Sequence, residues 1–154
     1  MIRHAEERDI PRVLALLRQV NMVHHLGRPD LFHGPATKYK ADELRSIFSD
    51  TERPVFVYTD AQDIVQGYAF CILQHPGSAL MTDILTLYID DLCVEEDCRG
   101  QGIGRALYEY VREYARQIGC YNLTLNVWAL NESALRFYQK CGLVPQKYGM
   151  ETIL

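Results

Sequence analysis

The sequence predicts a single α/β domain in which a mixed, mostly antiparallel sheet is flanked by helices. Two observations carry this prediction. Segments with apolar residues at helical spacing alternate along the chain with short strand-like apolar runs. The 154 residues are enough for one domain with its own core, and no repeat, linker or low-complexity tract divides them. We therefore expect one domain over residues 1–154.

The composition narrows the class of protein. Apolar residues make up 48% of the chain and charged residues 23%, which is typical of globular domains. No run approaches the ~18 apolar residues of a membrane span, so we expect no membrane partner. The net charge of −4 argues against nucleic acid as a partner and permits a cationic substrate. Five cysteines without a C-x-x-C pair indicate neither disulfides nor zinc, so we expect no metal and a cytoplasmic location.

The first 49 residues predict one strand and two helices. Ile2–Ala5 is typical of a short strand, and Asp9 is expected to cap a helix that has Pro11 in its first turn and ends at Gly27. A shorter helix is expected over Ala41–Ser49. The apolar face of the first helix consists of Ile10, Val13, Leu14, Leu17 and Val20, with His24 on the same stripe.

The middle of the chain predicts an antiparallel hairpin followed by a long strand. Arg28–Lys40 has no periodic pattern and is expected to be irregular. Strands are expected over Pro54–Tyr58 and Gly67–Leu73, because the turn-rich Asp60–Asp63 lies between them. The long strand runs over Ile84–Val94.

The last third predicts two helices and three strands. An amphipathic helix is expected over Gly102–Ile118, a strand over Asn122–Val127 and a helix over Glu132–Cys141. Leu143–Lys147 and Met150–Leu154 are expected to form a closing hairpin. The complete predicted order is β-α-α-β-β-β-α-β-α-β-β.

The segment from Arg99 to Gly104, with the sequence Arg-Gly-Gln-Gly-Ile-Gly, lies between the long strand and the amphipathic helix. Glycines there let a ligand approach the backbone, and the first helix amides have no partner within the helix. Together with the helix dipole, these amides predict a diphosphate site. A turn that uses glycine only for packing is the alternative. A Rossmann fingerprint starting at Gly100 is excluded, because Arg105 stands where its third glycine is required.

Two carboxylates, Asp90 and Asp91, lie next to each other inside the long apolar strand. Carboxylates are costly to bury, and neighbouring residues of a regular strand must point to opposite faces. They are therefore candidates for proton transfer from a cationic substrate. The structural alternative is one aspartate facing solvent and the other in a salt bridge.

A block from Asn131 to Gly142 has both a structural and a functional interpretation. Asn131 can cap a helix, Glu132 suits the positive end of its dipole, and Gly142 can end it. This account leaves only Tyr138 without an assigned role, unless it is a half-buried packing aromatic.

The glycine segment and this block, in this order, resemble the two motifs of the GNAT acyltransferase superfamily, whose members bind acyl-coenzyme A. The resemblance implies that Asn131 contacts the coenzyme and that Tyr138 protonates the leaving thiolate, which an ordinary phenol pKa would make cheap. It also implies that the strand backbone at residues 92–94 pairs with the pantetheine arm. The implied acetyl-CoA-binding residues are Leu92, Cys93, Val94, Arg99, Gly100, Gln101, Gly102, Ile103, Gly104, Arg105, Asn131, Ala134 and Tyr138.

The run Ile89–Val94 is also similar to the corresponding strand of diamine (spermidine/spermine) acetyltransferases. By this resemblance Asp90 matches the proposed general base, while Asp91 and a water chain remain alternatives. In the superfamily the early helices build the acceptor pocket. The substrate-binding candidates are His24, Asp30, Phe32, Tyr39, Asp90 and Asn126.

These expectations define an N-acetyltransferase that moves the acetyl group of acetyl-CoA to a primary amine, most simply a small cationic amine. Because no cysteine has an evident base partner, direct attack within a ternary complex is expected rather than an acyl-enzyme. Acetylation of a protein N-terminus or lysine is the alternative acceptor class. A non-catalytic acyl-CoA sensor is the alternative function, and resemblance to the superfamily also implies a homodimer.

Overall fold

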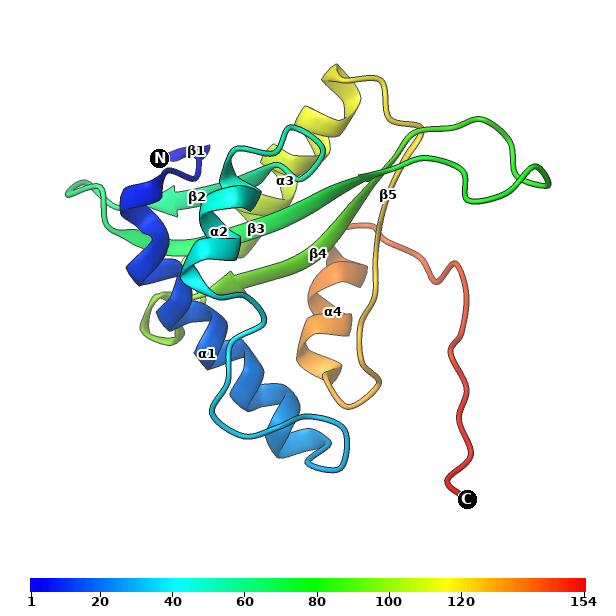
Figure 1. Ribbon diagram of the computed structural model, residues 1–154, viewed down its shortest axis with the longest axis horizontal. Coiled ribbons are helices and arrows are strands. Elements are labelled where there is room, and N and C mark those ends of the chain that lie inside the picture. The colour runs from blue at the N-terminus through cyan, green and yellow to red at the C-terminus, as the bar shows by residue number, and fades with distance from the viewer.

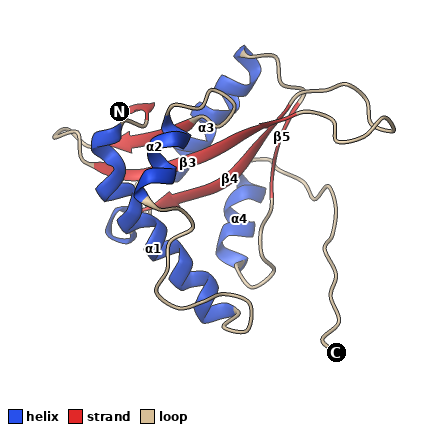
Figure 2. Cartoon of the chain, in the orientation of Figure 1, coloured by secondary structure: helices blue, strands red, loops and turns tan.

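The computed structural model describes residues 1–154 as a five-stranded sheet with helices on both faces (Figures 1 and 2). The strands lie in the order β1-β2-β3-β4-β5; the first three pairs are antiparallel and β4 and β5 are parallel. The predicted fold class is thus confirmed. The strands are β1 (Ile2–His4), β2 (Val55–Thr59), β3 (Val65–Gln74), β4 (Thr86–Val94) and β5 (Asn122–Leu125).

Four helices surround this sheet. α1 (Ile10–Gly27) and α2 (Ala41–Phe48) cover one face, and α3 (Ile103–Gln117) covers the other (Figure 1). α4 (Glu132–Lys140) lies beside β5. Short 3-10 turns precede α1 and α3, over residues 7–9 and 96–98. None of the helices has the length and apolar character that a membrane crossing requires.

The core consists of two clusters, because alternate side chains of the central strands point to opposite faces of the sheet. The α1 and α2 side contains the fully buried Val13, Leu16, Leu44, Val57 and Tyr68. The α3 side contains the fully buried Phe56, Ala69, Leu87, Leu107 and Val111.

Asp9 differs from its predicted capping role. It precedes α1, but its side chain makes no cap hydrogen bond to that helix. The buried carboxylate instead accepts hydrogen bonds from the Arg3 guanidinium at 2.7 and 3.0 Å and from the Glu6 amide at 2.8 Å. Asp9 therefore ties β1 to the start of α1, and the charge of Arg3 offsets the cost of burying it.

A β-bulge interrupts β4 at Asp90. In the register between β3 and β4, Phe70 pairs with Asp91 and Cys71 pairs with Ile89, so Asp90 is the extra residue without a partner. An inserted residue breaks the alternation of side chains along the strand. The bulge therefore places two consecutive residues of β4 on the same face of the sheet.

The prediction that the two carboxylates point to opposite faces is consequently wrong. Asp90 accepts a hydrogen bond from Tyr39 and Asp91 accepts one from Tyr68. Both tyrosines belong to the cluster on the α1 and α2 side. Both carboxylates thus lie on the face of the sheet where the acceptor was expected.

The predicted closing hairpin is absent. The chain has no regular secondary structure after α4 (Figure 1), and Glu151 in the C-terminal tail, residues 143–154, forms an ion pair with Arg28. The alternation of apolar residues suggested strands, but a strand needs a partner edge and a core to cover. Leu143 packs against the core cluster on the α3 side, but the other large apolar side chains of the tail remain exposed: Val144, Tyr148, Met150, Ile153 and Leu154.

Candidate active site

β4 and β5 separate halfway along β4 (Figure 1). Their parallel pairing begins at Thr86 and ends where Ile89 faces Leu125. Residues 91–94 of β4 therefore pair only with β3, and their other edge has no strand beside it. The Val94 carbonyl accepts hydrogen bonds from Gln19 Nε2 and Arg99 Nε, at 3.1 and 3.3 Å. An extended ligand can hydrogen-bond to the remainder of such an edge.

The glycine segment that follows β4 is open. Gly100 and Gly102 have φ angles of 76° and 82°, a left-handed conformation that glycine adopts without strain. A Cβ at either position would meet no atom within 4 Å. Packing therefore does not explain these two glycines. Gly104 is different, since a Cβ there would lie 3.4 Å from the Phe137 ring.

The amides of residues 100–105 have no hydrogen-bond acceptor within the protein. The first helical bond of this region is donated by Ala106 to the Gly102 carbonyl. Six consecutive free amides at the positive end of the 15-residue α3 form an anion site. Arg99 is exposed beside this loop, whereas exposed Arg105 pairs with Glu109 at 2.9 Å. The predicted diphosphate site thus has free amides available to an anion.

Asp90 binds a lysine ammonium of the chain itself. Lys38 Nζ lies 2.7 Å from Oδ1, and the Tyr39 hydroxyl donates a hydrogen bond to Oδ2 at 2.7 Å. The Asp90 side chain is only 12% exposed, so the carboxylate of this pair is largely shielded from water. Arg53 donates a hydrogen bond to the Tyr39 oxygen at 3.2 Å and thus fixes the hydroxyl. Tyr39 was a predicted substrate residue; Lys38 was not, because nothing periodic marks it in an irregular segment.

Asp91 has a different environment. The buried Tyr68 donates a hydrogen bond to Oδ2 at 2.8 Å. Burial raises the pKa of Asp91 to about 6, although the hydrogen bond from Tyr68 and the charge of Lys38 act in the opposite direction. A carboxylate with this pKa is ionised at neutral pH and is a stronger base than an ordinary aspartate. Asp91 is therefore a candidate proton acceptor.

Tyr138 lies on α4, and its hydroxyl makes no hydrogen bond within the protein. Burial raises the pKa of Tyr138. The negative charge of Asp91 is close enough to raise this pKa further. The phenol therefore stays protonated at neutral and mildly alkaline pH. The shift also makes it a weaker acid than the sequence alone suggested, so complete proton transfer to a thiolate costs more.

Asn131 caps α4 as predicted. Its Oδ1 accepts a hydrogen bond from the Ala134 amide at 3.1 Å, which leaves the side-chain NH₂ group available to a ligand. The cap fixes the first turn of the helix that carries Tyr138.

Three aromatic side chains connect the end of α1 to the segment after β5. The rings of His24 and Phe32 stack with centroids 5.0 Å apart, and Trp128 packs edge-on against Phe32 at 5.2 Å. Burial lowers the pKa of His24, with a further contribution from the charge of Lys38, so the imidazole is neutral at pH 7. Its Nδ1 is buried without a partner. His24 and Phe32 therefore lie near the lysine bound at Asp90.

Two predicted substrate residues are engaged elsewhere. Asp30 is exposed and pairs with Arg28 at 2.7 Å. The Asn126 side chain donates a hydrogen bond to the Tyr88 hydroxyl at 3.3 Å. Neither contacts the carboxylates of β4. The chain contains no group of three or more His, Cys, Asp or Glu residues arranged to hold a metal ion.

All five cysteines are free. Cys93, the cysteine on β4, is buried, and burial raises its pKa to about 12. A thiol with this pKa is almost entirely protonated at neutral pH and is a poor nucleophile. Cys93 is therefore poorly suited to carry an acyl group.

Residues 20–143 match the Acetyltransferase (GNAT) family. A thialysine N-epsilon-acetyltransferase from Bos taurus is 38% identical over 153 residues, covering 92% of this chain and 82% of that protein. The peptidyl-lysine N-acetyltransferase YjaB from Salmonella typhimurium is 29% identical over 142 residues, which cover 92% and 81% of the two chains.

Solved structures agree with this result. A mutant of the BH1408 protein from Bacillus halodurans superposes with a TM-score of 0.94 at 31% identity, over 100% of this chain and 99% of the other. Glucosamine-6-phosphate N-acetyltransferase from Arabidopsis thaliana has a TM-score of 0.73 at 18% identity, over 99% and 97% of the chains, and shares the fold.

Proposed function

We propose that this chain acetylates a small amine that resembles a lysine side chain. The chain belongs to the acetyltransferase (GNAT) family and is an acetyl-CoA-dependent N-acetyltransferase. One observation carries the choice of acceptor: Asp90, whose other oxygen accepts a hydrogen bond from Tyr39, binds the alkylammonium of Lys38, and this ammonium lies 5.7 Å from the centroid of the Tyr39 ring. An external ammonium of the same chemistry can replace it. The relative that is 38% identical acts on thialysine, which supports an amino acid acceptor. Peptidyl lysine, the substrate class named for YjaB, is the second candidate.

We assign the coenzyme to the open loop and to β4. The amides of residues 100–105 bind the diphosphate, and Leu92–Val94 pair with the pantetheine arm along the free edge of the strand. Asn131 and Ala134, at the start of α4, lie on the helix that carries Tyr138. Bound there, acetyl-CoA supplies the thioester carbonyl that the amine attacks.

The residues of the chain then bind the amine and transfer its protons. An alkylammonium has a reference pKa near ~10.4, so about one molecule in 10³ is free amine at neutral pH. Asp90 binds the cation, and Asp91 accepts its proton directly or through water. The Tyr138 hydroxyl donates to the sulfur as the C–S bond breaks. A β4 amide near Val94 meets the developing oxyanion.

The experiment that tests this proposal measures thiol release from acetyl-CoA with a panel of amines. The panel contains thialysine, lysine, a lysine-containing peptide, spermidine and glucosamine 6-phosphate. We expect the highest kcat/KM with the two amino acids. Asp90→Asn is expected to raise their KM about 10- to 100-fold, because a charge-assisted hydrogen bond contributes about 1.5–3 kcal/mol.

Asp30→Asn is the matched control, since Asp30 is an exposed carboxylate that also pairs with a cation, Arg28, but does not contact the carboxylates of β4. It should leave KM unchanged. A preference for spermidine or for the peptide would overturn the assigned acceptor. Coenzyme binding without thiol release from any amine would instead favour the acyl-CoA sensor.

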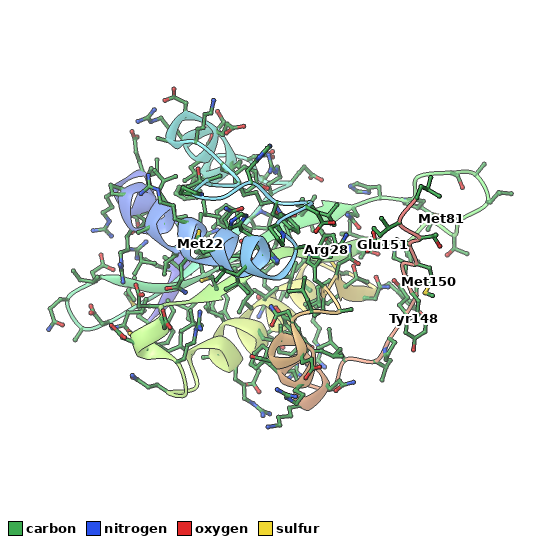
Figure 3. All side chains as sticks on the ribbon, turned by 90° about the horizontal axis from the view of Figure 1, so that it is seen from below. Met22, Arg28, Met81, Tyr148, Met150 and Glu151 are labelled. Carbon is green, nitrogen blue, oxygen red and sulfur yellow. The ribbon has the colours of Figure 1, made fainter.

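We also propose a homodimer, in a reducing compartment such as the cytoplasm where five free cysteines persist. A single chain leaves the outer edge of β5 without a neighbouring strand and the apolar tail, residues 143–154, without a core. Figure 3 shows Arg28 beside Glu151, with Tyr148 and Met150 on the tail. The edge and the tail of one copy can complete those of a second, an arrangement typical of twofold symmetry.

The oligomeric state tests this second proposal. Light scattering of the full chain is expected to give the mass of a dimer. Truncation after Gly142 removes the tail and is expected to give a monomer. A full-length monomer at micromolar concentration would contradict the proposed dimer and would leave the catalytic proposal intact.

A further inference from the structure

Lys38 differs from the other lysines of the chain. There are only four, at positions 38, 40, 140 and 147, and all four are exposed. Lys38 alone among them forms a salt bridge, and its partner is a carboxylate with a 12% exposed side chain. An exposed lysine gains little from an ordinary surface ion pair. The small stabilisation of a surface ion pair therefore does not explain why the Lys38 ammonium lies at Asp90.

The surroundings of the Lys38 ammonium are those that the proposed function assigns to the acceptor. Asp90, its partner, is the residue that would bind the substrate cation. The charge of Lys38 also acts on Asp91, where it opposes the rise in pKa caused by burial, and on His24, where it adds to the lowering of the pKa by burial. Asp91 in turn acts on Tyr138. The ammonium thus lies among the groups that would bind and deprotonate an amine.

We propose that Lys38 is an internal acceptor and that the chain acetylates this residue itself when acetyl-CoA is bound and no other amine is present. This inference rests on the proposed function. It adds a modification site on the irregular segment between α1 and α2.

The reaction is the ordinary one with Lys38 in place of the substrate. The ammonium loses one proton to Asp91 or to water, and the neutral amine attacks the thioester carbon. A C–N bond forms and the C–S bond breaks, with the sulfur taking a proton from Tyr138, while the nitrogen loses its second proton, which returns to Tyr138 through solvent. The products are acetyl-Lys38, coenzyme A as the free thiol, and one proton. No oxidant or further reactant is needed.

The local structure permits the short movement that this reaction requires. Lys38 belongs to a segment without regular secondary structure, and its side chain is 44% exposed. The neighbouring Tyr39 is held by its hydrogen bonds to Asp90 and Arg53 and by stacking on Phe70 at 5.5 Å. The chain next to Lys38 is therefore held in place at Tyr39, while the flexible four-carbon side chain of Lys38 can move.

Acetylation would also change the site. It removes the charge of Lys38, so the ion pair with Asp90 is lost. Asp90 then has only its hydrogen bond from Tyr39. The site would be left with a free carboxylate for an external ammonium.

The test is incubation of the full chain with acetyl-CoA alone, followed by peptide mapping by mass spectrometry. We expect one acetyl group per chain, at Lys38, gained about tenfold or more faster than at Lys40, Lys140 or Lys147, because a positioned amine reacts within the complex. The rate should not depend on protein concentration. Excess thialysine should slow the modification by competing for Asp90.

Variants separate this reaction from the chemical background. Lys38→Arg keeps a cation for Asp90 and should abolish the modification at that position. Lys40→Arg, two residues away, should leave the rate at Lys38 unchanged. Asp90→Asn should slow it about tenfold or more.

The outcomes also distinguish this inference from the function on which it rests. Turnover of thialysine with Lys38 unmodified would overturn the inference and leave the proposed function standing. Equal acetylation of all four lysines, or the same rate at Lys38 in urea, would show chemical background and would also overturn it. Acetyl-CoA binding with neither turnover nor modification would overturn both.

Discussion

Gly102→Glu is expected to lower the affinity for acetyl-CoA at least about 100-fold. The substitution places a carboxylate among the six free amides that we assign to the diphosphate. One added charge about 4 Å from a phosphate costs roughly 1 to 4 kcal/mol, depending on solvent exposure, and the diphosphate carries more than one charge. The left-handed φ of 82° also strains a glutamate by about 1–2 kcal/mol, which lowers the stability of the loop rather than the affinity itself. Isothermal titration with acetyl-CoA measures the loss.

Two controls separate charge from backbone strain. Gly119 lies just beyond α3, has the same φ of 82° and is equally open, so Gly119→Glu carries the same strain and charge at the other end of the helix. It should lower stability but leave the affinity for acetyl-CoA unchanged. Gly102→Asn puts a neutral residue that tolerates the left-handed conformation into the loop, and it should keep most of the binding. If Gly102→Glu still binds tightly, the diphosphate lies elsewhere.

This prediction depends on a region that could be read from the sequence. The strand, the glycine segment and α3 follow one another with strong and different periodicities, and the open loop at residues 99–104 follows from the left-handed glycines. The cap at Asn131 was predicted for the same reason, because capping is a local interaction. Interactions between residues that are close in the sequence can therefore be recognised from short sequence patterns.

The features that the sequence did not predict depend on pairing between distant segments. The bulge at Asp90 exists only in the register between β3 and β4, and strict alternation placed the carboxylates on opposite faces. Lys38 reaches Asp90 from 52 positions away, out of a segment without periodicity. The tail had the alternation of a hairpin but lacks, within one chain, an edge and a core to pack on. No short-range pattern encodes any of these contacts.

Tyr138→Phe is expected to lower kcat about 10²-fold or more and to change the affinity for acetyl-CoA by less than about threefold. The hydroxyl makes no hydrogen bond within the protein, so its removal breaks no structural contact. General acids typically contribute about 10²- to 10⁴-fold. Because the pKa of Tyr138 is raised, we expect the lower part of this range, with the hydroxyl acting largely as a hydrogen-bond donor to the developing thiolate.

Pre-steady-state thiol release, which reports the chemical step, is the appropriate measurement. Tyr108→Phe is a matched control, since Tyr108 is a buried tyrosine on α3 whose hydroxyl also makes no hydrogen bond within the chain. It should leave kcat unchanged. Full activity in Tyr138→Phe would show that the sulfur takes its proton from another group.

The pH profile shows whether Tyr138 and Asp91 act on different protons. The pKa of Asp91, about 6, lies above the ordinary value, so its base form is lost as the pH falls below 6, and kcat/KM should decline there. Tyr138→Phe should keep this acid limb at a lower rate, because the phenol is protonated throughout this range. Asp91→Asn should remove the limb. An acid limb that survives in Asp91→Asn would show that another base removes the proton from the amine. The proposed role of Tyr138, protonation of the departing sulfur, would be unaffected by that result.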